Sequence, residues 1–247
     1  MSTKNGIDSR QIRCHRLQVK QRIRQQLNTD LYNVDCLNSA GGRAADLFGG
    51  GRLDLQTPGR PEPDTYTYNP LDPPAEGDVT HPAALSFVDQ TRLLNTRGNG
   101  VFYHTEPFGE ETEIAGEVAL TIWLALDVRD TDLEATLFEI LPDGQNIELA
   151  SSQLRARYRE SLREEKLVSP GVPLPYRFSS FTWFARRIAK GSRLRLFFRS
   201  PNGTELQQNF NSGGVVAKET RKDARTARVT VLHVQAHPSV LEVPIRR

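Results

Sequence analysis

Short apolar runs that alternate with polar residues constrain this chain more than any other feature. The strongest run lies between Glu117 and Asp127, where the central letters VALTIWLAL are almost all apolar. An apolar run of this length between charged residues is typical of a strand buried on both faces or inside a sandwich core. We therefore expect a strand here, with Trp123 in the core.

Further strands are expected along the rest of the chain, each bounded by Gly, Pro or Asn: residues 133–141, 147–158, 175–183, 193–199 and 228–235. Pro142-Asp143-Gly144 between the first two predicts a hairpin, because Gly tolerates the positive φ of such turns. In the range 193–199, Leu and Phe alternate with Arg, which predicts one inward face and one face largely toward solvent. Repeated short strands predict an all-β fold, a jelly-roll β-sandwich.

The first part of the chain has a different pattern. Spaced apolar residues among Arg, Lys and Gln from Arg10 to Leu31 approximate one face of a basic helix. A Gly- and Pro-rich stretch follows, typical of an extended connector over a surface. We expect an irregular or short helical extension over 1–36, a connector over 37–80 and the β-sandwich over 81–247. Gly49–Gly51 lack the Lys-Ser/Thr of a phosphate loop.

Charge and cysteine usage limit the classes of partner and compartment. The 32 basic and 30 acidic residues give a net charge of +2, so neither nucleic acid nor an anionic membrane is an expected partner. Cys14 and Cys36 form no Cys-x-x-Cys pair and are expected to be free thiols. No apolar run resembles a signal peptide or a membrane helix, so we expect a cytoplasmic protein.

The chain shows no sequence pattern of a hydrolytic site. A Gly-x-Ser-x-Gly nucleophile elbow is absent from all 247 residues. The scattered candidates for a nucleophile or a base have no recognisable setting: Ser86, Ser212, His104, His233 and His237. We therefore predict no catalytic residue, and we expect His237 and also His81, each before a proline, to be turn or packing residues.

Carboxylates and aromatic residues supply two further candidate sites. Oxygen ligands for calcium could come from four residues: Asp127, Asp130, Asp132 and Asp143. Their spacing lacks the alternation of an EF-hand loop, so we expect solvated turns, and we predict neither a metal nor a cofactor.

Four aromatic side chains are available for stacking on a ligand: Tyr103, Trp123, Tyr158 and Trp183. An exposed Trp183 beside a groove would favour ligand binding.

Several short motifs occur in an order that resembles a known family. They are Tyr-x-Pro-x-Asp-Pro at 68–73, Tyr-His-Thr-Glu-Pro at 103–107, Ile-Ala-Gly-Glu-Val at 114–118, Asp-Thr-Asp at 130–132, Pro-Asp-Gly at 142–144 and Leu-Arg-Ala-Arg-Tyr-Arg-Glu-Ser at 154–161. With His-Pro-Ser at 237–239, they resemble the C-terminal domain of Xaa-Pro dipeptidyl-peptidases and cocaine-esterase-like (CocE/NonD) serine hydrolases. The resemblance covers Leu37 to Ile245.

The resemblance implies a galactose-binding-domain-like jelly roll packed against an α/β-hydrolase domain. In that family the catalytic Ser, Asp and His precede the jelly roll, and the residues before Leu37 are too few to hold a hydrolase sheet. Arg97-Gly98-Asn99-Gly100 departs from the family pattern of Arg followed by acidic residues. The domain is therefore expected to be noncatalytic alone. A separate catalytic chain, evolutionary loss and a gene fragment remain open as explanations.

Three arginines are the candidate domain-docking residues. Arg155, Arg157 and Arg159 alternate with Leu154, Ala156 and Tyr158, which predicts three like charges on one face of a strand. They could pair with acidic residues of a partner domain. The alternative is a charged sheet face that is paired across strands with residues such as Glu139 or Glu148.

Three functions follow from these observations. The first is an accessory β-domain that stabilises or dimerises a hydrolase or shapes its site entrance, with a hydrolase domain or a second copy as partner. The second is an independent module that binds carbohydrate or peptide. The third is ester or Xaa-Pro peptide hydrolysis with a complementing catalytic subunit. The sequence leaves enzymatic activity, substrate and oligomeric state open.

Overall fold

The computed structural model describes residues 32–35, 50–54, 63–72, 100–201, 207–234 and 236–246. The expected basic helix from Arg10 to Leu31 lies outside these ranges. So do Cys14, Cys36, Gly49, His81 and Ser86, and also Arg97-Gly98-Asn99 of the motif that departs from the family pattern. The division into 1–36, 37–80 and 81–247 stays a prediction.

The described residues contain strands and three short 3-10 helices. The strands are β1 (Tyr32–Asp35), β2 (Gly50–Asp54), β3 (Asp64–Tyr68), β4 (Gly100–His104), β5 (Thr112–Gly116), β6 (Ala119–Leu126), β7 (Asp132–Ile140), β8 (Asn146–Arg155), β9 (Leu174–Phe178), β10 (Phe184–Ile188), β11 (Arg193–Arg199), β12 (Ala227–Leu232), β13 (Val240–Glu242) and β14 (Ile245–Arg246). The 3-10 helices are η3 (Ala156–Tyr158), η4 (Val216–Lys218) and η5 (Arg221–Asp223). The all-β prediction is confirmed.

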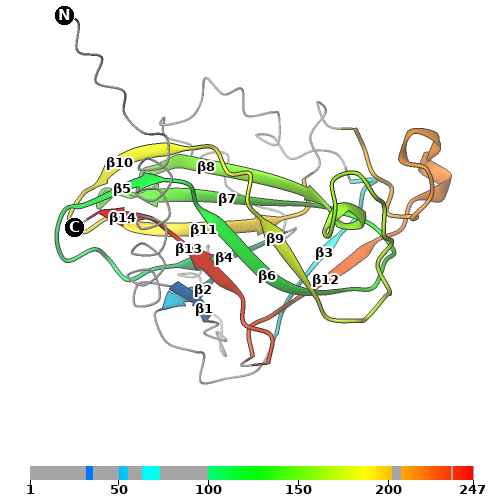
Figure 1. The fold of residues 1–247 in the computed structure, drawn as a ribbon, viewed down its shortest axis with the longest axis horizontal. Coiled ribbons are helices and arrows are strands. Elements are labelled where there is room, and N and C mark those ends of the chain that lie inside the picture. Colours follow the sequence, from blue (N-terminus) through cyan, green and yellow to red (C-terminus); the bar gives the residue numbers. More distant parts are fainter. Residues whose placement is uncertain are drawn as a thin grey trace, which may run out of the picture.

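The strands form two sheets, shown in Figure 1. The larger sheet has the order β3-β12-β6-β13-β1-β2-β4-β11-β7-β8, and β9 pairs with β6. The smaller sheet has the order β10-β5-β14. Phe178 of β9 meets Phe198 of β11 edge to face, with 5.8 Å between ring centroids, although these strands are not neighbours in the sheet. The larger sheet therefore folds over one core, as in a β-sandwich, and its jelly-roll connectivity stays a prediction.

Two strands occupy the range for which the Gly and Pro pattern predicts an extended connector. β2 pairs in parallel with β4, and β3 pairs antiparallel with β12. The side chains of Leu53, Tyr66 and Tyr68 belong to the main core cluster. The connector interpretation is wrong for these strands, because their apolar side chains fill core space that the local Gly and Pro signals do not reveal.

Strand β6 is buried on one face and half-buried on the other. Leu120, Ile122 and Leu124 are fully buried, whereas alternate residues are intermediate. Trp123 lies on the intermediate face against His237, with 4.5 Å between ring centroids. The expectation that Trp123 is a core residue is wrong, because it points away from the core that its neighbours fill. The expected packing role of His237 is confirmed.

The hairpin and the strand 193–199 form as predicted, but the burial of one face of that strand differs from the prediction. Gly144 in the β7–β8 turn has φ 92°, and β11 has the predicted bounds. Its arginine face is not solvent-exposed: Arg195, Phe197 and Arg199 are buried, and Arg193 is half-buried. Two side chains of that face contact neighbouring strands: Arg199 pairs with Glu134 of β7 at 2.6 Å, and Phe197 stacks on Phe102 of β4. Cross-strand ion pairing and stacking make the burial of this face tolerable.

Candidate functional site

A buried ion pair at one end of the sandwich is the centre of the candidate site. Asp130, in the turn between β6 and β7, is fully buried and accepts hydrogen bonds from the Arg157 backbone N at 2.9 Å and from its Nε at 2.8 Å. Asn209 Nδ2 donates to the same carboxylate at 2.8 Å. A buried charge is stable only when it is paired and hydrogen-bonded in this way. Asp130 is therefore a structural anchor for three chain segments.

Burial and ion pairing shift the pKa values of Asp130 and Arg157 in opposite directions. Burial raises the pKa of the Asp130 carboxyl above its ordinary value, although Arg157 and Asn209 favour the charged form. Burial alone would lower the pKa of Arg157, but Asp130 and Glu165 raise it above its ordinary value. The guanidinium therefore stays charged and needs all of its acceptors.

The same guanidinium holds two loops. Arg157 Nη1 contacts Glu165 Oε2 at 3.2 Å, in the loop that follows η3. Its Nη2 donates to the Gly214 carbonyl oxygen at 2.8 Å, in the loop before η4. The hydroxyl of Tyr158 donates to Glu165 Oε1 at 2.8 Å, and this bond lowers the pKa of Glu165. One buried side chain thus fixes the relative position of both loops.

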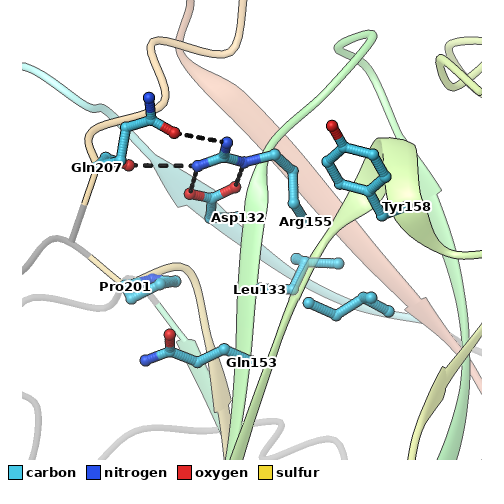
Figure 2. Close-up of a pocket in the computed structure, with 8 residues that line it drawn as sticks. Asp132, Leu133, Gln153, Arg155, Tyr158, Pro201 and Gln207 are labelled. Atoms are coloured by element: carbon cyan, nitrogen blue, oxygen red, sulfur yellow. Dashed lines mark hydrogen bonds and ion pairs between the residues drawn. The ribbon is translucent and has the colours of Figure 1, made fainter. Parts of the chain in front are cut away.

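Arg155 forms a second, partly exposed pair. Its Nε and Nη2 donate to the two carboxylate oxygens of Asp132 at 2.7 and 3.0 Å, and its Nη1 donates to Gln207 Oε1 at 3.0 Å (Figure 2). The bonds to Asp132 raise the pKa of Arg155. Asn209 donates to Asp132 at 3.1 Å and to Asp130, so the two pairs form one network.

A small pocket of about 220 Å³ lies beside the Arg155 pair (Figure 2). Its lining residues are Asp132, Leu133, Gln153, Leu154, Arg155, Tyr158, Pro201 and Gln207. Leucine and proline side chains supply apolar surface, and the other residues supply carboxylate, amide, guanidinium and phenol groups. Because Asp132 neutralises Arg155, the pocket has little charge preference and suits one neutral, partly polar group.

The arginines do not line one strand face, so that prediction is wrong. β8 ends at Arg155, and η3 turns the chain because the backbone N of Ala156 donates to the Thr131 carbonyl and that of Arg157 donates to Asp130. The Arg159 side chain is buried, with its Nη1 donating to the Ala156 and Lys166 carbonyls. Arg155 does pair across strands, but with Asp132 of β7, and Glu139 instead binds Arg186 at 2.5 Å. A docking role for these arginines stays a prediction.

Sequence patterns contain no signal for several members of this network. Asn209 and Gln207 lie more than fifty positions from their partners Asp130 and Arg155. Glu165 lies in a run of charged residues that resembles an ordinary solvated loop. The one available hint is the pair Asp130 and Asp132, for which the sequence predicts solvated turns, and that prediction is wrong for both of them.

The predicted hydrolytic candidates are in other environments. Ser212 donates to Glu219, which also accepts the backbone N–H of Gly214 and of Phe210. His104 is half-buried on β4 and accepts a hydrogen bond from Arg195. His233 is buried. The carboxylates of Asp127 and Asp143 accept backbone N–H bonds, which is the expected turn role.

The aromatic candidates divide between core and surface. Tyr103 is fully buried, and its hydroxyl donates to Asp64 at 2.9 Å. Trp183 is 72% exposed, between the buried residues Phe181 and Phe184. It does not line the pocket beside Arg155. Ligand binding by Trp183 requires that its side chain is exposed and that it lies beside a groove. The first condition is met, but the pocket beside Arg155 is not the groove.

Metal-binding clusters and membrane-spanning helices are both absent from the described part of the chain. Among these residues, no three His, Cys, Asp or Glu side chains are grouped so that they could hold a metal ion. None of the helices in this part has both the length and the apolar character that crossing a membrane requires.

Similarity to known proteins is extensive but partial. The cocaine esterase of Rhodococcus sp. (strain MB1 Bresler) is 30% identical over 207 residues, which are 83% of this chain and 36% of that protein. The chain thus spans about a third of the length of this relative. An alpha-amino acid ester hydrolase has a similar fold, with a TM-score of 0.73 at 21% identity over 88% of this chain and 36% of its own. An aminopeptidase from the marine sediment archaeon Thaumarchaeota archaeon has a TM-score of 0.71 at 20% identity, over 87% and 36% of the two chains.

A family model matches most of the chain. The model of the X-Pro dipeptidyl-peptidase C-terminal non-catalytic domain matches residues 23–242. This range includes both loops that Arg157 holds and every described strand except β14. Because the match covers most of the chain, the protein belongs to the family of X-Pro dipeptidyl-peptidase C-terminal non-catalytic domains.

Proposed function

We propose that this chain acts as a noncatalytic accessory β-domain for an α/β-hydrolase domain. The observation that carries the proposal is the family match over residues 23–242, to a domain whose description is non-catalytic. The chain also corresponds to 36% of the length of the related cocaine esterase, as expected for one domain of a larger hydrolase. Its role is to stabilise the hydrolase domain or to shape the entrance of its site.

The environments of the candidate residues support a noncatalytic role. A serine nucleophile needs a base within hydrogen-bond reach that takes its proton. Ser212 donates to the Glu219 carboxylate and not to an imidazole, and this carboxylate also accepts two backbone N–H groups, so it serves to hold the loop. The His104 Nε2 lone pair, which a general base would need, accepts the Nε–H of Arg195. Neither residue is available for acyl transfer in this arrangement.

Fluorophosphonate labelling tests the proposal. The purified chain is incubated with the probe and assayed in parallel on a p-nitrophenyl ester and an Xaa-Pro chromogenic substrate. We expect no labelled serine and no turnover, while the Rhodococcus cocaine esterase serves as the positive control for the ester assay. Labelling that disappears in Ser212→Ala or in another single Ser→Ala variant, together with turnover, would overturn the noncatalytic role.

An independent binding module is the second candidate function, and the exposure of Trp183 favours it. A planar, exposed indole stacks well on a sugar ring or a peptide. Tryptophan fluorescence titration with a panel of monosaccharides and short peptides tests this function. Saturable quenching that is lost in Trp183→Ala supports it, and an unchanged spectrum throughout the panel rejects it. Hydrolysis with a complementing subunit and a cytoplasmic location stay predictions.

A further inference from the structure

Both tryptophans of this chain lie outside its core. Trp183 is 72% exposed just before β10, and Trp123 is half-buried on the outer face of β6. Tryptophan is enriched at the centres of protein interfaces, although a single exposed apolar residue is common on any surface. The surroundings of Trp123 therefore decide whether its face is an interface.

Strand register places ten side chains on this outer face. Trp123 lies directly opposite Pro175 of β9 and Leu232 of β12, and opposed residues of antiparallel strands point to the same side of a sheet. The other opposed positions extend the face along β6: Ala125 with Thr230, Thr121 with Arg177 and Val240, and Ala119 with Glu242. All ten are exposed or half-buried, while the alternate residues of β6 fill the core. We call these ten residues the Trp123 face.

The centre of the Trp123 face is held in place by the connection between β12 and β13. The ring of Trp123 packs against His237, with 4.5 Å between ring centroids. The Trp123 backbone N donates to Ser239 Oγ at 2.9 Å, and this hydroxyl donates to the Leu232 carbonyl. Because the indole is already positioned, little ordering cost remains when a partner covers it.

Strand β6 divides the Trp123 face into two flanks. β9 pairs with residues 120–124 of β6, which overlap the residues paired with β12 and those paired with β13. β12 and β13 therefore share the other side of β6 (Figure 1). Arg177 lies on the β9 flank, and Glu242 lies on the β13 flank.

Arg177 and Glu242 are the two charged members of the Trp123 face. Within the described part of the chain, neither side chain is in an ion pair. The neighbouring charges Glu117, Asp127 and Arg228 lie beyond the two ends of β6. A solvated face of an antiparallel sheet is usually polar, whereas this one is small or apolar at its centre with opposite charges on its two flanks.

The other outer face of the sandwich is already closed. Phe102, Phe138 and Phe197 form a second buried cluster on the outer side of β4, β7 and β11. The ion pair of Arg199 with Glu134 lies on the same side and is buried as well. Of these two outer faces, the Trp123 face is the one that a partner can cover.

We propose that the Trp123 face binds a second copy of this chain, related by a two-fold axis parallel to β6. This axis places the β9 flank of one copy over the β13 flank of the other, so Arg177 faces Glu242 of the partner subunit, and the same contact occurs twice. A two-fold axis across the strands would place each arginine over the arginine flank of the other copy, which like-charge repulsion disfavours. Charge complementarity therefore selects both the partner and the orientation.

The dimensions of the face agree with this arrangement. On β6, Thr121 opposite Arg177 and Ala119 opposite Glu242 are two positions apart, or about 6.6 Å. Packed sheets lie about 10 Å apart, so an arginine and a glutamate can span the separation. Three strands about 4.8 Å apart and the eight residues of β6 give a face of about 14 by 26 Å. A face of this size supports a weak dimer, with a Kd of about 100 μM.

Sedimentation velocity of the full chain tests the proposal. We expect the 27.8 kDa monomer to convert to a species of twice that mass as the concentration rises from about 10 μM to about 1 mM. Thr121→Arg introduces a charge at the centre of the face without changing a core residue, and this variant should stay monomeric over the whole range.

A charge swap tests the orientation. Arg177→Glu and Glu242→Arg should each weaken the dimer about tenfold, because each brings like charges together. The double variant that carries both substitutions should restore the Kd to within about threefold of the wild type, since the pair is then only reversed. The control Arg187→Glu, at an exposed arginine about 20 Å from the face, should dimerise like the wild type.

A folded wild type that stays monomeric throughout the concentration range would overturn the proposal. So would a dimer that both single charge reversals leave unchanged, or a folded double variant that does not recover dimerisation. Serine labelling by fluorophosphonate would overturn the proposed noncatalytic role alone, because the oligomeric state does not depend on that role.

Discussion

Replacing His104 by glutamine should remove most of one pH-dependent component of stability. His104 on β4 lies directly opposite Arg195 of β11, and its Nε2 accepts the Arg195 Nε–H at 2.7 Å. Burial, followed by the charges of Arg195 and Arg193, lowers the pKa of His104 from 6.5 to about 4. The bond requires neutral imidazole, because a protonated ring has no acceptor nitrogen. The glutamine amide in His104→Gln could still accept from Arg195 but could not titrate.

The magnitude follows from proton linkage. A histidine whose folded-state pKa lies below its unfolded value binds more protons when unfolded, so stability falls as pH falls through this window. For values of 6.5 and about 4, the free energy of unfolding loses about 2 kcal/mol between neutral pH and pH 5 and about 3 kcal/mol by pH 4. Above pH 6.5 the contribution is complete, and well below pH 4 no more is lost.

Urea denaturation followed by tryptophan fluorescence measures this effect. Wild type and His104→Gln are unfolded at several pH values between neutrality and about pH 4, with m-values compared to check two-state behaviour. Carboxylates titrate in both proteins, so the difference between the two free energies isolates His104. We expect that difference to change by about 3 kcal/mol in favour of His104→Gln on acidification. Parallel stability curves for the two proteins would refute the reasoning.

The remaining predictions concern the buried pair, the core and one glycine, and each is measured by urea denaturation at neutral pH. Asp130→Ala leaves a buried guanidinium without its main partner and should lower the free energy of unfolding by about 3–5 kcal/mol. The control Arg187→Ala, at a residue 74% exposed, should lower it by less than about 1 kcal/mol. Equal losses in the two variants would contradict this argument. Phe198→Ala removes a fully buried ring that contacts two other rings and should cost about 3–5 kcal/mol, so a loss below about 1 kcal/mol would argue against one shared core. Gly213→Ala should cost about 1–3 kcal/mol, because φ is +80° and the new Cβ would lie 2.8 Å from the Arg129 Cβ; a neutral substitution would show that this loop relaxes.

Much of the fold can be predicted from local sequence pattern. Alternation predicts a strand over 193–199, and the strand has these bounds in the structure. The hairpin between β7 and β8 follows from Pro142-Asp143-Gly144, since a glycine there can adopt the positive φ that the turn requires. Family membership likewise follows from short motifs in order, and the match over residues 23–242 supports it.

The environment of individual side chains could not be predicted in the same way. The alternation in β11 separates its two faces correctly, but only the neighbours Glu134 and Phe102 determine that the arginine face is buried. In the same way, Trp123 has an apolar sequence context and yet lies on the half-buried face against His237. Period-two patterns assign residues to faces and do not state what covers each face.

The sequence alone determined several strands such as 193–199, the hairpin at Pro142-Asp143-Gly144 and the family, because these depend on neighbouring residues and on short motifs. Only the tertiary structure decided the site. Arg157 pairs with Asp130, 27 positions away, and holds Gly214, 57 positions away. Such contacts form because an unpaired guanidinium in the protein interior is costly, so the folded chain brings acceptors to it from distant loops. No local pattern encodes that requirement, which arises only once the sheets have closed around the charge.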